Sequence, residues 1–60
     1  MSVKDLLFAT GSSTSIEIYD IDSLLWEGTV NEINFLDDVP YGDYEVSTIG
    51  VSEGILQIHI

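Results

Sequence analysis

The sequence predicts a small α+β domain: a short N-terminal helix, two β-hairpins that form a small antiparallel sheet, and a short helical turn between the hairpins. Three observations predict it. The first residues place apolar side chains at helical spacing, two later stretches alternate apolar and polar residues, and the segment between those stretches contains the only proline. A chain of 60 residues has room for one domain, residues 1–60.

The N-terminal helix is expected over residues 3–9. Ser2 can cap it, and Asp5, three residues later, completes the spacing of a capping box and places a negative charge at the positive end of the helix dipole. The apolar side chains that share one side of this helix are Val3, Leu6 and Leu7.

The first hairpin is expected to pair residues 15–20, "SIEIYD", with residues 24–30, "LLWEGTV". Side chains alternate across a strand, so Glu17 and Tyr19 should face solvent while the isoleucines beside them face the core. One face of the second strand should carry Leu24, Trp26, Gly28 and Val30. The "DIDS" stretch between the strands is turn-rich, although its Ile21 is an unusual turn residue.

The second hairpin is expected to pair residues 44–51, "YEVSTIGV", with residues 55–60, "ILQIHI", through the short loop "SEG". In the last strand one face should carry Leu56, Ile58 and Ile60, and the other Gln57 and His59.

The segment from Asn31 to Val39 is compatible with a helix or a loop. Asn31 can cap one or two helical turns, which would turn Ile33, Leu36 and Val39 toward the core. Pro40 excludes helix at Val39 or soon after it, because the residue before a proline is biased away from the α region.

Charge excludes several classes of partner. The net charge is −10, from eleven Asp and Glu against Lys4 alone. Nucleic acids and anionic membrane surfaces both require Lys and Arg, so we expect no direct nucleic-acid binding and no membrane association. No apolar run approaches the roughly 20 residues of a membrane span, and the first residues lack the features of a signal peptide, which predicts a cytoplasmic protein. The partner that fits is a basic protein surface.

Two explanations of the charge stay open. The carboxylates can serve solubility and turn chemistry alone, or they can bind a basic surface as a DNA mimic does. Solubility needs a net charge of only about 2 to 8, and self-repulsion beyond that lowers stability. Exposed tyrosines are typical anchors of binding surfaces. The predicted partner-binding residues are Glu17, Tyr19, Glu27, Asp37, Asp38, Tyr41, Asp43, Tyr44 and Glu45.

Residue sets that carry out catalysis are missing from the sequence. It contains no Cys and no Arg, its lone His59 has no identifiable partner, and no nucleophile elbow or phosphate loop occurs. The start of "DIDS" resembles a calcium loop, but Leu24 occupies the fifth position and no glycine follows it. We therefore expect no enzyme activity, no cofactor and no metal site.

Self-association is expected because the core is small. A chain of this length buries only about 60% of its unfolded surface, and no disulfide compensates. The final strand, "ILQIHI", is apolar enough to require cover inside the sheet or against a second copy. We predict a homodimer at micromolar concentration.

The stretches "VKDLL" at residues 3–7 and "IEIYD" at residues 16–20, with the paired terminal strands ending at Ile60, resemble small acidic accessory proteins of phages and prophages of Gram-positive bacteria. The resemblance covers most of the chain. It implies an inhibitor, in the host cytoplasm, of a defence enzyme such as a nuclease, helicase, restriction or CRISPR component, and it assigns no site residues. The alternative class is a self-associating structural protein whose charge serves solubility only.

Overall fold

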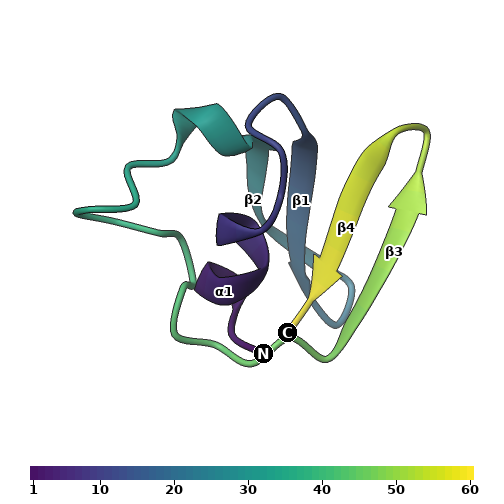
Figure 1. The fold of residues 1–60 in the computed structure, drawn as a ribbon. Coiled ribbons are helices and arrows are strands. Elements are labelled where there is room, and N and C mark those ends of the chain that lie inside the picture. Colours follow the sequence, from purple (N-terminus) through teal and green to yellow (C-terminus); the bar gives the residue numbers. More distant parts are fainter.

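One short helix packs against one face of a four-stranded sheet in the computed structural model, which describes residues 1–60 (Figure 1). The elements in chain order are α1 (Val3–Phe8), β1 (Ser15–Asp20), β2 (Ser23–Thr29), the 3-10 turn η1 (Val30–Glu32), β3 (Thr48–Ser52) and β4 (Ile55–His59). The predicted α+β class is confirmed. Neither helical element has the length and apolar character needed to cross a membrane.

The sheet is mixed, so the prediction of an antiparallel sheet is wrong at its centre. The strand order is β2-β1-β4-β3; both predicted hairpins form, but β1 and β4 pair in parallel. The connection between the hairpins explains this. Residues 30–47 carry the chain back to the end of the sheet where β2 began, so β4 runs in the same direction as β1 (Figure 1). The alternation within each hairpin contains no information about that direction.

Helix α1 is confirmed together with its predicted cap. The side-chain oxygen of Ser2 accepts a hydrogen bond from the amide three residues later at 3.2 Å. The amide of Val3 donates to the carbonyl of Tyr44 at 2.9 Å, and the amide of Lys4 donates to that of Gly42 at 3.0 Å. The loop before β3 thus satisfies amides that have no partner within the helix.

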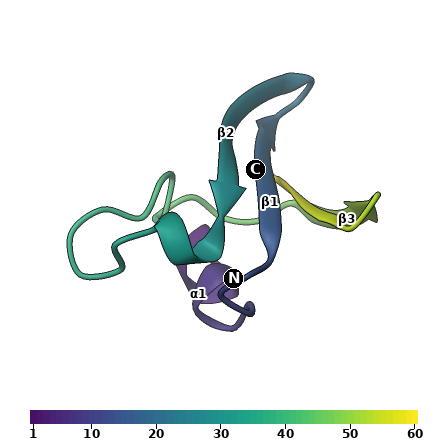
Figure 2. The same cartoon turned by 90° about the horizontal axis from the view of Figure 1, so that it is seen from above.

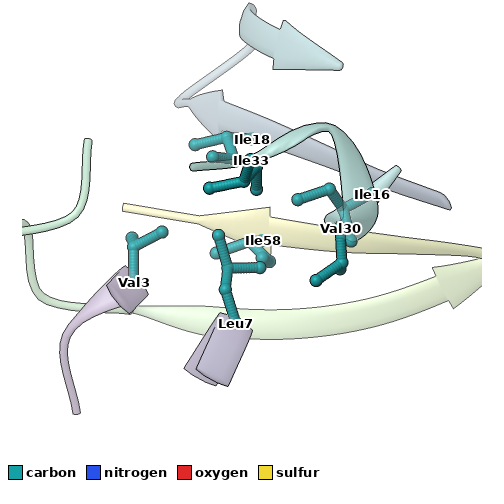
Figure 3. Packing of buried hydrophobic residues seen from close by; sticks show 7 residues of the cluster. All are labelled: Val3, Leu7, Ile16, Ile18, Val30, Ile33 and Ile58. Atoms are coloured by element: carbon teal, nitrogen blue, oxygen red, sulfur yellow. The ribbon is translucent and has the colours of Figure 1, made fainter. Parts of the chain in front are cut away.

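The core lies beneath the two central strands. Its buried residues come from α1, β1, β4 and the segment that follows β2: Val3, Leu7, Ile16, Ile18, Val30, Ile33 and Ile58 (Figure 3). Ile18 and Ile58 are neighbours in the parallel register, and neither is accessible to solvent. No buried residue comes from β3.

A β-bulge changes which residues of β2 share a face. Ile18 pairs with Trp26 but Tyr19 pairs with Leu24, which leaves Leu25 as the extra residue. Leu24 therefore lies on the face opposite Trp26, and the prediction that these two side chains share a face is wrong. The bulge reverses the alternation at that point in the strand.

The predicted helix between the hairpins is replaced by η1 and an irregular loop, residues 33–47. Asn34 accounts for the difference. Its side-chain oxygen accepts from the amide of Leu36 at 3.0 Å, and its carbonyl accepts from the amides of Asp37 at 3.2 Å and Asp38 at 2.9 Å. These bonds close a tight turn that competes with a helix. Leu36, predicted to face the core, is 95% exposed.

The second hairpin begins later than predicted, at Thr48. Residues 44–46 run beside the N-terminus instead of joining the sheet, and Ser47 is the first residue to bond to β4, with its amide donating to the carbonyl of His59 at 2.7 Å. Ser2 and Glu45 form an isolated antiparallel bridge, and the amide of Val46 donates to the carbonyl of Met1 at 2.9 Å. This strand-like stretch of sequence thus finds its backbone partner outside the main sheet.

Candidate protein-binding surface

Almost all of the acidic side chains are exposed and unpaired. Of the eleven carboxylates, only that of Glu17 is partly buried. The single ion pair joins the N-terminal amine to Glu45 at 2.8 Å, and Lys4 forms none. The remaining carboxylates are therefore without a cation from this chain.

The sheet face opposite α1, called the outer face below, has no element covering it (Figure 2). Its side chains form rows because in-register residues of neighbouring strands share a face. In strand order, the middle row is Glu27, Glu17, Gln57 and Gly50, and the row beside it is Leu24, Tyr19, His59 and Thr48.

Glu17 is the centre of a hydrogen-bond network on the outer face. The hydroxyl of Tyr19 donates to Glu17 Oε1 at 2.9 Å, and the side-chain amide of Gln57 donates to the same oxygen at 3.2 Å. The Tyr19 ring stacks on His59 with ring centroids 5.3 Å apart. The hydrogen bond to Glu17 raises the pKa of Tyr19 above its ordinary value, so the phenol remains a donor near neutral pH. Glu17 is thereby fixed in orientation.

A pocket of about 350 Å³ at one end of the outer face is lined by Glu17, Glu27 and Glu32 among its residues. Glu17 and Glu27 stand directly opposite each other in the β1–β2 register. Like charges in that position destabilise an antiparallel pair, and no cation of this chain offsets them. The arrangement favours a cationic group supplied from outside.

A second pocket, of about 260 Å³, lies where the loop meets the start of α1. Its charged residues are Asp37, Asp38, Asp43 and Lys4. Phe35 fixes this part of the loop, since its ring packs edge-on against Phe8 of α1 at 5.0 Å between centroids. The neighbouring Leu36 lines the same pocket with its side chain exposed. We call residues 35–43 the acidic loop; it presents carboxylates and apolar groups together.

The remaining predicted site residues adjoin the acidic loop. Tyr41 and Tyr44 are both exposed and pack against each other with ring centroids 5.7 Å apart. Glu45 follows them, and among the predicted site residues only its carboxylate is already paired with a cation. A partner that binds the Glu45 carboxylate would have to displace the N-terminal amine.

The predicted site residues thus separate into two groups. Glu17, Tyr19 and Glu27 lie on the outer face, whereas the other six lie in or beside the acidic loop. The two pockets have no residue in common, and the loop and the β3–β4 hairpin lie on opposite sides of the β1–β2 hairpin (Figure 2). The structure does not assemble all nine residues into one site.

Sequence reasoning missed three neighbours of the outer-face group: Gln57 and His59, which contact it, and Glu32, which lines the same pocket. The alternation in the last strand placed Gln57 and His59 on its less apolar face, but the parallel pairing with β1 brings them to Glu17 and Tyr19. Glu32 reaches its pocket because η1 follows β2 directly.

No cluster of three or more His, Cys, Asp or Glu side chains has the arrangement needed to hold a metal ion. Comparisons with protein-family models, with curated proteins and with solved structures found no match for this chain. The resemblance to phage accessory proteins and the absence of enzyme activity therefore stay predictions.

Proposed function

We propose that this protein is a small acidic protein-binding module that occupies a basic, nucleic-acid-binding surface of another protein. In the phage setting implied by the sequence resemblance, the partner is a defence enzyme in the host cytoplasm. The observation that carries the proposal is the unneutralised charge. Ten of the eleven carboxylates are exposed, and the chain forms only one ion pair, between its own N-terminal amine and Glu45.

Solubility alone is a weaker explanation of this charge. A small domain needs a net charge of about 2 to 8 for solubility, and charges of both signs usually serve it. Here the net charge is −10 with one lysine, and Glu17 and Glu27 face each other across two strands. Such an arrangement lowers the stability of the fold, so a benefit outside the fold is needed to account for it.

The acidic loop is the part of the surface best suited to a basic partner. Three aspartates line one pocket there and outnumber the single Lys4 beside them, next to the exposed Leu36. Arg or Lys side chains that normally hold phosphates would form charge-assisted hydrogen bonds with these carboxylates. Leu36 and the Tyr41–Tyr44 pair would supply the apolar contacts on which binding energy usually concentrates.

Capture from a bacterial lysate tests the proposal. The immobilised protein should retain a basic nucleic-acid-binding protein at about 50 mM salt and lose most of it at about 200 mM. A DNA duplex should then displace the purified partner, because both ligands occupy one surface. A partner that binds DNA and this protein at the same time would contradict the proposal.

A matched pair of variants separates a site from bulk charge. Asp37→Asn/Asp38→Asn/Asp43→Asn removes three charges from the acidic loop pocket. Asp20→Asn/Asp22→Asn/Glu53→Gln removes three charges at the turn ends of the two hairpins, outside both pockets. The first variant should lose capture and the second should keep most of it. Equal capture by both variants and the parent would favour the alternative class, in which the charge serves solubility only.

A further inference from the structure

Strand β3 is an edge strand without the features that normally keep edges unpaired. Its residues, Thr48–Ser52, contain no charge and no proline, and their register with β4 is regular. The other edge, β2, carries Glu27 and a bulge beside Leu25. Charges, prolines and bulges protect natural edges from pairing with other chains. The contrast marks β3 as the open edge of the sheet.

The backbone of β3 has free hydrogen-bonding groups at that edge. A two-residue turn, residues 53–54, joins β3 to β4, and both of its residues have positive φ, 54° and 78°, as in a type I′ turn. Ser52 and Ile55 beside this turn form a hydrogen-bonded pair, and pairing alternates from there along the ladder. The amides and carbonyls of Ile49 and Val51 therefore point away from β4, and no loop, turn or cap hydrogen bond uses them.

The side chains of Ile49 and Val51 are not covered by any other element. Ile49 and Val51 pair with Ile58 and Leu56 of β4, so they lie on the face of the sheet that α1 covers further along. The hairpin projects beyond α1 (Figure 1), and Ile49 is 49% exposed and Val51 72% exposed. The side chains of Ile49 and Val51 therefore extend the apolar core to the edge of the sheet where the backbone of β3 is unpaired.

We infer that β3 pairs with β3 of a second copy, antiparallel, about a two-fold axis at Gly50. In this register Ile49 of each copy lies opposite Val51 of the other, and these two positions are the ones whose backbone groups point outward. The four apolar side chains share one face and extend both cores. Gly50 meets its own copy in the closer, non-hydrogen-bonded type of pair, where a glycine permits close approach.

The distribution of charge favours a second copy of this chain as the partner that pairs with β3. Two chains of net charge −10 repel each other wherever their carboxylates meet, and β3 is the edge that carries none. In the register about Gly50, Thr48 lies opposite Ser52 and Glu53 opposite Ser47, so no carboxylate faces another. A basic partner would instead be attracted to the acidic loop or the outer face. The contact is isologous, so it closes at two copies.

Sedimentation equilibrium between about 1 µM and 1 mM, the range of weak specific association, tests the inference. The mass should rise from monomer to dimer. Hydrogen exchange followed by NMR on the unmodified chain should show the amides of Ile49 and Val51 becoming protected as the dimer forms. A monomer mass throughout, or a dimer in which these two amides exchange as fast as in the monomer, would overturn the inference.

Variants of opposite charge complete the test. Val51→Lys and Val51→Glu should both abolish the dimer, because either places a charge in the apolar seam, and both should fold because the site is 72% exposed. Leu36→Lys is the matched control, an exposed apolar side chain in the loop replaced by the same cation, and it should leave the dimer intact. The inference fails if Val51→Lys strengthens association while Val51→Glu weakens it, because the net charge of the chain and not the apolar contact would then determine the association. It fails equally if Leu36→Lys dissociates the dimer.

Discussion

The two hairpins are built alike but hold the fold together unequally. The first, β1–β2, contributes Ile16 and Ile18 to the core, and it carries a bulge, two opposed glutamates and an isoleucine at positive φ in its turn. The second, β3–β4, has a regular register and a Glu-Gly turn with both residues at positive φ, and only Ile58 of it is buried. The β1–β2 hairpin, which supplies more of the core, thus carries the bulge and the opposed charges. The regular β3–β4 hairpin leaves the outer edge of β3 unpaired.

The largest expected effect is on the core of the first hairpin. Ile18→Ala should lower the free energy of unfolding by about 2–5 kcal/mol, because the side chain is fully buried and the cavity cannot collapse completely. Ile49→Ala, at a half-exposed position of the second hairpin, should lower it by less than about 1 kcal/mol. Urea unfolding at low protein concentration, where no dimer forms, gives both values. Equal losses would contradict the comparison.

The glycines of the two hairpins should respond in opposite directions. A Cβ at Gly28 would lie 2.8 Å from the Trp26 ring and 2.7 Å from a Glu32 oxygen, so Gly28→Ala should destabilise the fold by about 1–3 kcal/mol. At Gly50 the nearest atom would be 4.0 Å away, and Gly50→Ala should be neutral or stabilise by about 0.5 kcal/mol. Thermal unfolding at low protein concentration, where no dimer forms and Gly50 does not meet its own copy, distinguishes the two. Under that condition a lower melting temperature for Gly50→Ala would count against the open outer face.

The two turns should also respond in opposite directions. Ile21 has φ of 57°, a strained value for a β-branched residue, so Ile21→Gly should stabilise the fold by about 1 kcal/mol. Gly54 has φ of 78° with nothing near its Cβ position, so Gly54→Ala should destabilise by about 1 kcal/mol through the backbone alone. Melting temperatures measure both changes. A destabilised Ile21→Gly would mean that the Ile21 side chain makes a contact that outweighs its strain.

The smallest expected effect is a pH dependence outside both hairpins. The hydrogen bond from the N-terminal amine to Glu45 raises the pKa of that amine above its ordinary value of 8.0. A raised folded-state pKa contributes stability that is present below pH 8 and is lost as pH rises through the folded value. Unfolding measured from pH about 7 to 9.5, below the tyrosine range, should show this decline in the parent and not in Glu45→Gln. An identical decline in both chains would exclude this ion pair as its cause.

Features that depend on neighbouring residues were predictable from the sequence. Ser2 as a cap, the strand at residues 15–20 and the outward placement of Glu17 and Tyr19 follow from local propensity and alternation. Features that depend on distant contacts were not. The direction of β4 relative to β1 is set by where the loop returns the chain, and alternation in either strand is the same for both directions.

The candidate site shows the same division. Exposure of the acidic residues could be predicted, because charged side chains in turns and on strand faces seldom lie in a core. Their grouping could not: Asp37, Asp38 and Asp43 share a pocket because the Asn34 turn replaces the expected helix. The bulge at Leu25 likewise gave no signal in the alternation of β2.

Thermal unfolding of a charge-neutralised chain at several salt concentrations tests most directly that the carboxylates serve binding and not the fold. The variant is Glu27→Gln/Asp38→Asn/Asp43→Asn, which leaves in place the paired Glu45 and the carboxylates of Glu17 and Asp37, both of which accept side-chain hydrogen bonds. Because self-repulsion falls, it should melt at a higher temperature than the parent at low salt, and the difference should vanish near 1 M salt, where the screening length is about 3 Å. A variant that melts below its parent at low salt would show that these carboxylates hold the fold together, and would contradict the account.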